Sequence, residues 1–342
     1  MSDKPLTVEQ QVAAYRSRVM QLNGADPSSD TKFNVQPAVE QKLEQAIVEK
    51  ADFLKAINVV GVRDLEGEKV AVGANGTIAR RTNTDDNDRQ TKSVAGLSDE
   101  KYRCEKTEFD THLKWSTLDA WSSQPNFQKL VNGAVTTQIA RDRLMIGFNG
   151  EEAAAETDPN ANPLLEDVNI GWLKHIKTAR PESFLSGIKI GAGAGADFKN
   201  IDAAVYAARH ELIAPWHEND TSLESIMGSG MLVDKNVAAI ESNEAATERA
   251  ALQTLLYNNL VGTLRPSLVP FFPSKSLLIT SKKNLSIYYQ RGSRRRYVKA
   301  NPKRDRLEDF QSVNEAYVVE DLDKAAVLSG CLFWNEVTEA WE

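Results

Sequence analysis

The sequence is poor in the residues from which metal and redox sites are built. It has two cysteines and four histidines among 342 residues. Cys104 and Cys331 lie far apart and match no metal or redox spacing, so we expect two buried or neutral thiols. The histidines lack the H-x-x-x-H spacing of a helical zinc site. These shortages favour a protein without a metal, and we expect no cofactor.

Long apolar runs are also missing. No stretch of 18 apolar residues occurs, and the polar residues after Met1 do not resemble a signal peptide. We therefore expect a soluble, cytosolic chain without a membrane segment. Its length suggests about two domains, and 41% hydrophobic residues suffice for real cores.

The most informative stretch of the chain runs from Val59 to Trp115, between two helical segments. Its tip, residues 80–92, contains no apolar side chain. Such a segment cannot bury itself in a core of its own, so it is either disordered or ordered by another molecule. At about 3.3 Å per residue, an arm of roughly 15 residues reaches about 50 Å and extends well beyond a compact body.

The flanks of this excursion have strand character. Strict alternation of apolar and polar residues from Thr107 to Trp115 predicts a half-buried strand. On the outgoing side, 59–62 and 69–72 are rich in valine, with Glu66-Gly67 as a candidate turn between them. We therefore expect an extended hairpin.

Hydrophobic spacing predicts helices on both sides of the hairpin. The first ends at Asn23-Gly24, before a flexible linker over 26–30. The second begins at Pro37 and continues to Ile57. A third helix over 125–148, the longest rigid element, would span about 35 Å.

The pattern changes to mixed α/β over 162–284, which predicts a compact second domain. Helices are expected over 201–213 and 244–257, and strands over 222–227 and 277–280. Strand character resumes after residue 284, so the chain is expected to return to its first domain.

An enzymatic alternative rests on the glycine loop 191–196. It matches G-x-G-x-x-A, the looser dinucleotide fingerprint, after a strand-like segment. A dinucleotide site also needs an acidic residue at the end of the next strand. The strand over 222–227 runs instead into Gly228-Ser229-Gly230, so we interpret the loop as a connection and assign no catalytic residue.

Seven short segments, taken together, resemble the major capsid proteins of peduovirus-type temperate tailed phages. No single segment is diagnostic, but all lie in the same order and at matching spacing through essentially the whole chain. They are Tyr15–Val19, Phe33–Pro37, Ser116–Trp121, Gly147–Gly150, Asn284–Tyr289, Asn301–Arg306 and Tyr317–Asp321.

The resemblance implies an α+β chain with the tailed-phage capsid fold, also called the Hong Kong phage fold. It divides the chain into an N-terminal assembly segment or propeptide, an N-arm helix, an extended hairpin arm, a peripheral domain with a spine helix, and an axial domain. The expected bounds are, in that order, 1–33, 34–58, 59–115, 116–161 with 285–342 (spine helix 125–148), and 162–284.

The resemblance also implies a function. The chain would be a major capsid protein that forms hexamers and pentamers of an icosahedral head around double-stranded DNA, assembled in the bacterial cytoplasm and located in the virion. Its partners would be copies of itself, a capsid scaffolding protein or prohead protease, the portal, and packaged DNA non-specifically at most, with no membrane. The alternatives are another phage or encapsulating-compartment shell protein and a dinucleotide-binding enzyme that uses the Gly191 loop.

Family members carry an N-terminal segment that a prohead protease trims. The corresponding junction here would be Lys32, Phe33, Asn34 and Val35, just after a polar linker of the kind that proteases cut easily. The alternative is an ordinary flexible N-terminus that is never cut.

Charge is unevenly distributed near the C-terminus. Residues 282–306 hold ten basic residues and one acidic, whereas residues 307–342 hold nine acidic residues and Lys324. The arginines of this basic block could pair with acidic residues of the same or another subunit, contact packaged DNA in a salt-sensitive manner, or face solvent. We favour pairing because the acidic block follows at once. The candidate intersubunit contacts are Arg80, Arg81, Asp85, Asp86, Asp88, Arg89, Arg294, Arg295 and Arg296.

Overall fold

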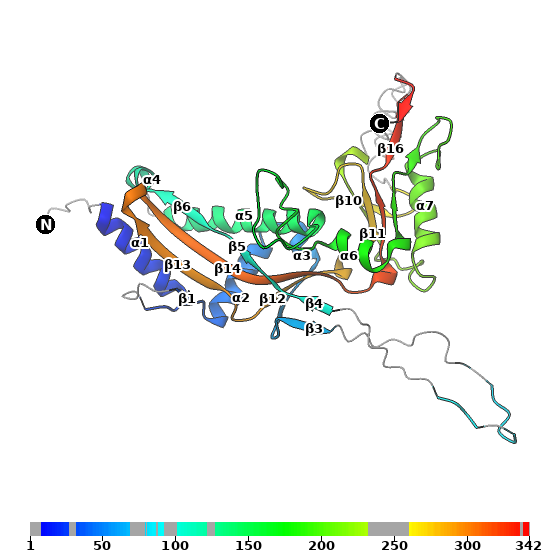
Figure 1. Ribbon diagram of the computed structural model, residues 1–342, viewed down its shortest axis with the longest axis horizontal. Helices are drawn as coiled ribbons and strands as arrows, with labels where there is room; N and C mark the ends of the chain where they lie inside the picture. Colours follow the sequence, from blue (N-terminus) through cyan, green and yellow to red (C-terminus); the bar gives the residue numbers. More distant parts are fainter. Residues whose placement is uncertain are drawn as a thin grey trace, which may run out of the picture.

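The computed structural model describes residues 8–26, 32–68, 79, 81–86, 88–91, 101–121, 127–231, 260–335 and 338–341. Figure 1 shows an elongated first body, with α1 (Val8–Leu22) at one end, and a second body around α7 (Ile201–Leu212) set at an angle to it. A hairpin of β3 (Glu66–Glu68) and β4 (Lys101–Arg103) points away from both bodies.

The first body is built on a sheet to which the described residues contribute seven strands. Their path is β1-β13-β14-β12-β2, and β5 and β6 pair with β14 as well. The long strand β14 pairs antiparallel with β12, β13, β5 and β6, whereas β2 lies parallel to β12. The bounds are β1 Phe33–Asn34, β2 Asn58–Val62, β5 Glu105–Glu108, β6 Thr111–Lys114, β12 Leu285–Gln290, β13 Arg295–Asn301 and β14 Arg306–Val319.

Helices cover this sheet and form the larger core with it. They are α2 (Pro37–Val48), α3 (Asp52–Ala56), α5 (Phe127–Asn149) and α6 (Trp172–Ala179). Trp172 is fully buried, and its indole N–H donates to the Ser286 carbonyl at 3.0 Å. At the far end, α1 and α4 (Trp115–Trp121) pack Tyr15, Val19 and Leu118 against Val298 and Leu307.

The second body contains a five-stranded sheet of order β10-β9-β11-β15-β7 in the described residues. Its bounds are β7 Phe184–Ser186, β9 Glu224–Met227, β10 Arg265–Leu268, β11 Leu277–Thr280 and β15 Ala326–Ser329. Ala204 and Val205 of α7 pack against this sheet in a second core. A smaller sheet joins β8 (Lys189–Ile190), β16 (Leu332–Asn335) and β17 (Ala340–Trp341). The expected peripheral segment 285–342 therefore contributes strands to both bodies.

Several expected elements are confirmed. The first helix ends at Leu22, the long helix spans Phe127–Asn149, and strands occupy Glu224–Met227 and Leu277–Thr280. The expected helix over 244–257, the strand over 69–72 and most of the linker over 26–30 lie outside the described residues. No described helix is both long and apolar enough to cross a bilayer.

Three local expectations were wrong. The helix expected from Pro37 to Ile57 is interrupted between Val48 and Asp52. The strand expected over 107–115 breaks at Phe109 and Asp110, because Phe109 N–H donates to the Gln311 carbonyl and the Asp110 carboxylate accepts from Gln311 N–H.

The third concerns Glu66-Gly67, which lies in β3 rather than in a turn. A Cβ added to Gly67 would lie 2.5 Å from the Tyr102 hydroxyl. This glycine therefore allows close cross-strand packing rather than a reversal of the chain.

Candidate interaction surfaces

The tip of the hairpin arm carries charge and little else. Arg81, Asp85, Asp86, Asp88 and Arg89 are all exposed, whereas Arg80 lies outside the described residues. Figure 1 shows the described tip residues standing away from the body of the molecule. The Asn83 amide donates to Asp86 at 2.8 Å and its oxygen accepts from Asp85 N–H at 3.2 Å, so the tip forms a local polar turn.

The root of the arm, by contrast, is anchored in the first body. Cys104 packs with Ala316 and Val318 of β14, and the largely exposed Arg103 pairs with Glu105 of β5 at 2.9 Å and with Glu66 across the hairpin at 3.4 Å. The ring of Tyr102 meets that of Tyr288 edge to face, with 5.1 Å between centroids. Cys104 is buried there, and burial raises the pKa of its thiol to about 12, as expected for a neutral structural cysteine.

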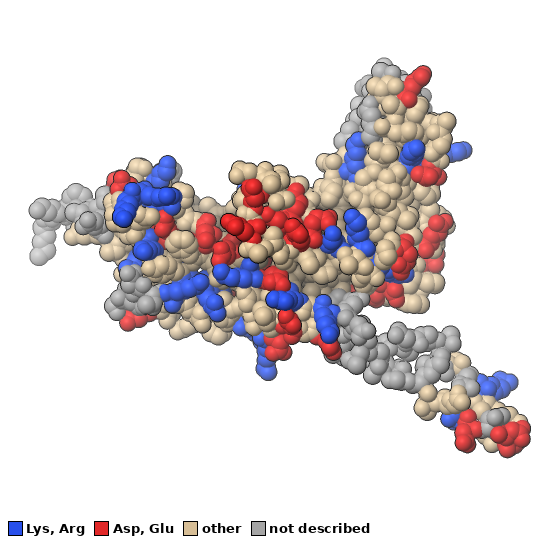
Figure 2. All heavy atoms as spheres, in the orientation of Figure 1, with Lys and Arg blue, Asp and Glu red and all other residues tan. Residues whose placement is uncertain are grey.

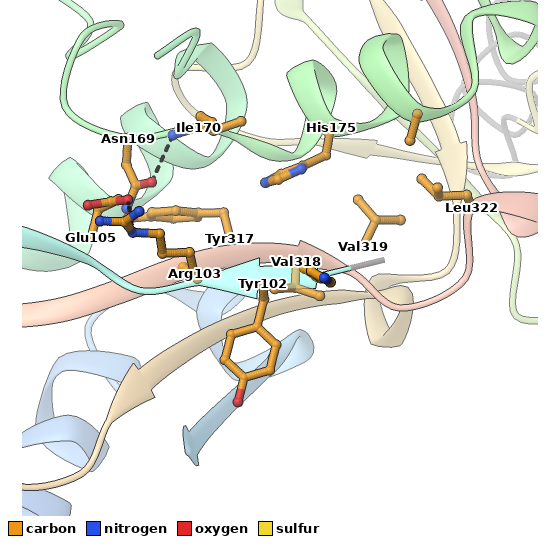
Figure 3. Close-up of a pocket in the computed structure, with 13 residues that line it drawn as sticks. Tyr102, Arg103, Glu105, Asn169, Ile170, His175, Tyr317, Val318, Val319 and Leu322 are labelled. Atoms are coloured by element: carbon orange, nitrogen blue, oxygen red, sulfur yellow. Dashed lines mark hydrogen bonds and ion pairs between the residues drawn. The ribbon is translucent and has the colours of Figure 1, made fainter. Parts of the chain in front are cut away.

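A cavity of about 390 Å³ lies beside this root. Figure 3 shows Asn169, Ile170 and His175 on one side of it and Tyr317, Val318 and Val319 of β14 on another. Its lining is mostly apolar, with the Arg103–Glu105 pair at the arm. The cavity lies between the arm root and α6, and its ionisable lining residues include Lys101 and His175 as well as Arg103 and Glu105, but no group of metal-binding side chains is found among the described residues.

The three predicted arginines of the basic block have different environments. Arg294 is 1% exposed and pairs with Glu44 of α2. Arg296 makes a bidentate pair with Asp309 of β14, with Nε–Oδ1 and Nη2–Oδ2 distances of 2.9 and 2.5 Å. Arg295 lies between them and is exposed, because successive side chains of a strand point to opposite faces. In the protomer, Arg294 and Arg296 are therefore used within the chain.

Arg143, which sequence reasoning missed, is the centre of a buried charge cluster. This α5 residue is fully buried and binds Glu315 of β14 at 2.5 Å and Glu44 of α2 at 2.8 Å. Burial alone would raise the pKa of Glu44, but Arg143 and Arg294 outweigh it and lower that pKa to about 2. We call Glu44, Arg143, Arg294 and Glu315 the buried charge cluster. It joins the N-arm helix α2, the long helix and the sheet.

The sequence held a partial signal for this cluster. Glu40, Glu44 and Ile47 are buried together at spacings of four and three residues on one face of α2. Carboxylates on the buried face of a helix require buried cationic partners. Nothing in the sequence identifies those partners, however, because Arg143 is 99 positions from Glu44 and Glu315 is 172 from Arg143.

The predicted cleavage junction lies at the edge of the large sheet. Phe33 and Asn34 pair with Arg296 and Arg295 of β13, and Val35 N–H donates to the Arg294 carbonyl at 3.0 Å. Val35 is 2% exposed, whereas Lys32 is exposed. Asn34 is exposed as well but is paired in β1, so Lys32 is the exposed residue of the junction that lies outside the sheet.

The Gly191 loop has a packing role in this fold. Cβ atoms added to Gly191 and Gly193 would lie 2.6 and 2.3 Å from atoms of the Trp334 side chain. The next helix begins only at Ile201, and its N-cap Asn200 accepts from Ala203 N–H at 2.8 Å. The glycines thus make room for an indole, and the helix terminus is satisfied by its own side chain.

A long helix on a strand-rich sheet, a second sheeted body and a projecting charged arm together define a capsid subunit of the tailed-phage fold. The fold is similar to a chain of the satellite phage P4 procapsid including size determination (Sid) protein, with a TM-score of 0.78, 34% identity and coverage of 89% of this chain and 94% of that chain. A chain from the capsid of a native GTA particle shares the fold at a TM-score of 0.52 and 14% identity, over 84% of this chain and 90% of that one.

Sequence comparison gives the family. The phage major capsid protein, P2 family, matches residues 11–331. The capsid proteins of Escherichia phage P2 are 37% identical over 331 residues, covering 93% of this chain and 91% of that protein. The major capsid protein of Serratia phage KSP20 is 37% identical over 330 residues, covering 93% of this chain and 95% of that one.

The chain therefore belongs to the P2 family of phage major capsid proteins. Its function is that of a major capsid protein, a structural component of the virion, and the predicted resemblance and fold class are confirmed.

Proposed function

We propose that this capsid protein closes its shell by laying the hairpin arm on an adjacent subunit of the same hexamer or pentamer. The observation that carries the proposal is the contrast within one hairpin. The root is held by ring packing and by the buried cluster around Cys104, whereas the tip exposes Arg81, Asp85, Asp86, Asp88 and Arg89. A charged tip without a core of its own is suited to complementary charges on a neighbour.

Because the contact is repeated in every subunit, weak contacts of this kind can hold a closed shell together. One exposed ion pair contributes roughly 0–1 kcal/mol. In a closed shell every subunit makes the same contact, so the small contributions act together. The proposed mechanism is assembly without chemistry, and the chain is not an enzyme.

Deletion of residues 80–92 tests the arm. The variant should keep the circular dichroism spectrum of the parent protein, because the deleted residues contribute no apolar side chain to either core. It should form no shells in electron micrographs. Normal particles built from the deletion variant would refute the role of the arm.

We also propose that the N-terminal segment 1–33 acts in assembly and is trimmed at the junction Lys32 to Val35. The exposure of Lys32, next to residues tied into the sheet, supports cleavage at the start of the junction rather than within it. Mass spectrometry of subunits from purified particles tests this, because full-length subunits throughout would contradict it. A scaffolding protein or protease, the portal and non-specific contact with packaged DNA complete the proposed partners.

We also propose a different place in the shell for each of the two bodies. The first body would form the shell wall with α5 as the spine helix, and the second body, roughly 162–284 with β15, would lie near the capsomer centre. The second body's own core, between α7 and one face of its sheet, supports this division, and the other face of that sheet joins the larger core through Ile226, Leu278 and Val327. Titration with NAD tests the enzymatic alternative, since saturable binding at the Gly191 loop would contradict a purely structural role.

A further inference from the structure

A groove that the proposed arm contact does not use lies between three helices of the first body. Its volume is about 400 Å³. The C-terminal end of α1, one face of α2 and the N-terminal half of α5 form its walls. Its apolar lining consists of Val19, Leu22, Val39, Leu43, Ala46, Val135 and Ile139. Leu22 is 48% exposed, so the apolar surface is incompletely covered in the protomer.

The charged side chains that line this groove, among the described residues, are all basic. Lys42 of α2, Lys50 just after α2 and Lys129 of α5 line it and are exposed. Arg296 lies at its floor, already paired with Asp309, and none of the described residues that line the groove is acidic. The groove thus offers an apolar strip beside three available cations.

Gly133 is a second, independent sign that something else belongs in the groove. It lies within α5, where glycine is less favourable than alanine. A Cβ added to Gly133 would meet nothing within 4 Å, whereas one added to Gly147 of the same helix would lie 2.3 Å from the Trp172 ring. Packing within the chain therefore explains Gly147 but leaves Gly133 without a reason. A glycine facing open space permits close approach of another backbone.

We propose that this groove binds an amphipathic helix of a protein other than the shell subunit, with an apolar ridge flanked by carboxylates. A helix laid in an apolar groove is a recurring mode of recognition. The 12 residues of α2 define a wall of about 18 Å, which suits three to four turns of a bound helix.

Charge complementarity specifies the chemistry of the occupant, because the three exposed lysines beside the groove suit carboxylates on a bound helix. Among the helices that the structure describes, α7 exposes Tyr206, but Arg209 and His210 lie beside it. We assign the occupant to a different, acidic polypeptide, and a second copy of this chain is the alternative that the self-association measurement below tests.

The binding experiment uses the unassembled full-length chain and a labelled synthetic helix of about 18 residues, with a leucine ridge flanked by glutamates. Fluorescence anisotropy should show saturable binding that weakens with added salt, because surface charges are screened. A peptide with lysines in place of the glutamates should bind at least about tenfold more weakly. Equal binding of the two peptides would overturn the assignment of an acidic partner.

Matched variants place the binding in the groove. Gly133→Leu should weaken binding about tenfold or more by filling the groove, whereas Ala134→Leu, on an exposed neighbouring position outside it, should not. Lys42→Glu with Lys129→Glu should weaken binding, whereas Lys199→Glu with Lys303→Glu should not. Unchanged binding by Gly133→Leu would overturn the site.

Two further results separate this proposal from its alternatives. The variant lacking residues 80–92 should still bind the acidic peptide, so failure of the arm and failure of the groove are distinguishable. Light scattering of the full-length chain should show the same self-association for Gly133→Leu as for Ala134→Leu. A loss of self-association specific to Gly133→Leu would assign the groove to a second copy and overturn the proposal.

Discussion

The basic block and the arm tip have similar residues and opposite environments. Arg294 and Arg296 are held in buried ion pairs within the protomer, whereas Arg81 and Arg89 stand exposed at the end of the arm. Figure 2 shows the charged residues of the tip separated from those of the body. The difference lies in what surrounds each arginine, because only the basic block has carboxylates of its own chain beside it on a sheet and a packed helix.

The comparison teaches how a shell subunit divides its charges. Buried charges fix how elements of one protomer meet, since a buried ion without its partner costs several kcal/mol. Exposed charges contribute little to the protomer and stay available to another copy. The number of arginines in a segment therefore says less about assembly than the burial of each one.

The largest expected effect is on the buried charge cluster. Arg143→Met removes the cation that binds both Glu44 and Glu315, so the buried Glu315 carboxylate is left uncompensated and Glu44 keeps only Arg294. We expect the free energy of unfolding to fall by about 3–5 kcal/mol, measured by urea denaturation of the unassembled chain. Arg295→Met, at an exposed position of the same block, should change it by less than about 0.5 kcal/mol. Equal effects would remove the distinction between buried and exposed arginines.

Charge reversal at the arm tip should give the second-largest effect, and this effect is on shell assembly rather than on folding of the protomer. Arg81→Glu with Arg89→Glu should leave the urea midpoint unchanged and lower the yield of shells about tenfold or more, because like charges then face the neighbour. Sedimentation separates shells from free subunits. The matched variant, Lys199→Glu with Lys303→Glu, makes the same change in net charge away from the arm. If both variants assembled equally, net charge and not the arm would govern assembly.

Lowering the pH should destabilise the folded protomer, because it protonates the Glu44 carboxylate. The pKa of this carboxyl is lowered in the folded chain to about 2 from its ordinary value of 4.5. Its stabilising contribution is therefore complete above about pH 4.5 and is lost as pH falls toward 2. Urea midpoints measured from pH 5 to pH 3 should fall less steeply for Glu44→Gln than for the parent chain. Parallel slopes would mean that Glu44 is not held ionised by its two arginines.

The smallest expected effect on stability comes from an exposed ion pair whose N–O distance equals that of a buried pair. Lys55 and Asp52 lie 2.8 Å apart, the same distance as Arg143 and Glu44, but their side chains are 49% and 99% exposed. Lys55→Ala should leave the urea midpoint unchanged within error, because solvent screens the pair. A clear loss of stability would show that distance, rather than burial, sets the contribution of these ion pairs.

Elements with a strong local signal could be predicted from the sequence. The long helix over Phe127–Asn149 follows from hydrophobic periodicity, and the buried strand Leu277–Thr280 follows from a short continuous apolar run. The interruption between Val48 and Asp52 and the break at Phe109 could not, since each depends on contacts made elsewhere in the fold. Gly67 was taken for a turn signal because glycine is common in turns, but its lack of a side chain serves packing under Tyr102.

The candidate interaction surfaces were predictable to a lesser extent. Lack of apolar residues predicted, from composition alone, that the arm tip has no core of its own and is either disordered or ordered by another molecule. The pairing of Arg294 with Glu44 and of Arg143 with Glu315 was hidden, because such partners are set by how helices cross a sheet. The groove at Gly133 was hidden for the same reason, since three separate helices form it.

The long strand β14 has a mechanical consequence. Its hydrogen-bond ladders to β5 and β6 carry the arm, and after a short 3₁₀ turn the same chain enters β15 in the other sheet. A pull along the arm would load many of these bonds in shear, at the same moment, rather than peel them one after another. A force on the arm would therefore pass through β14 to the sheets of both bodies.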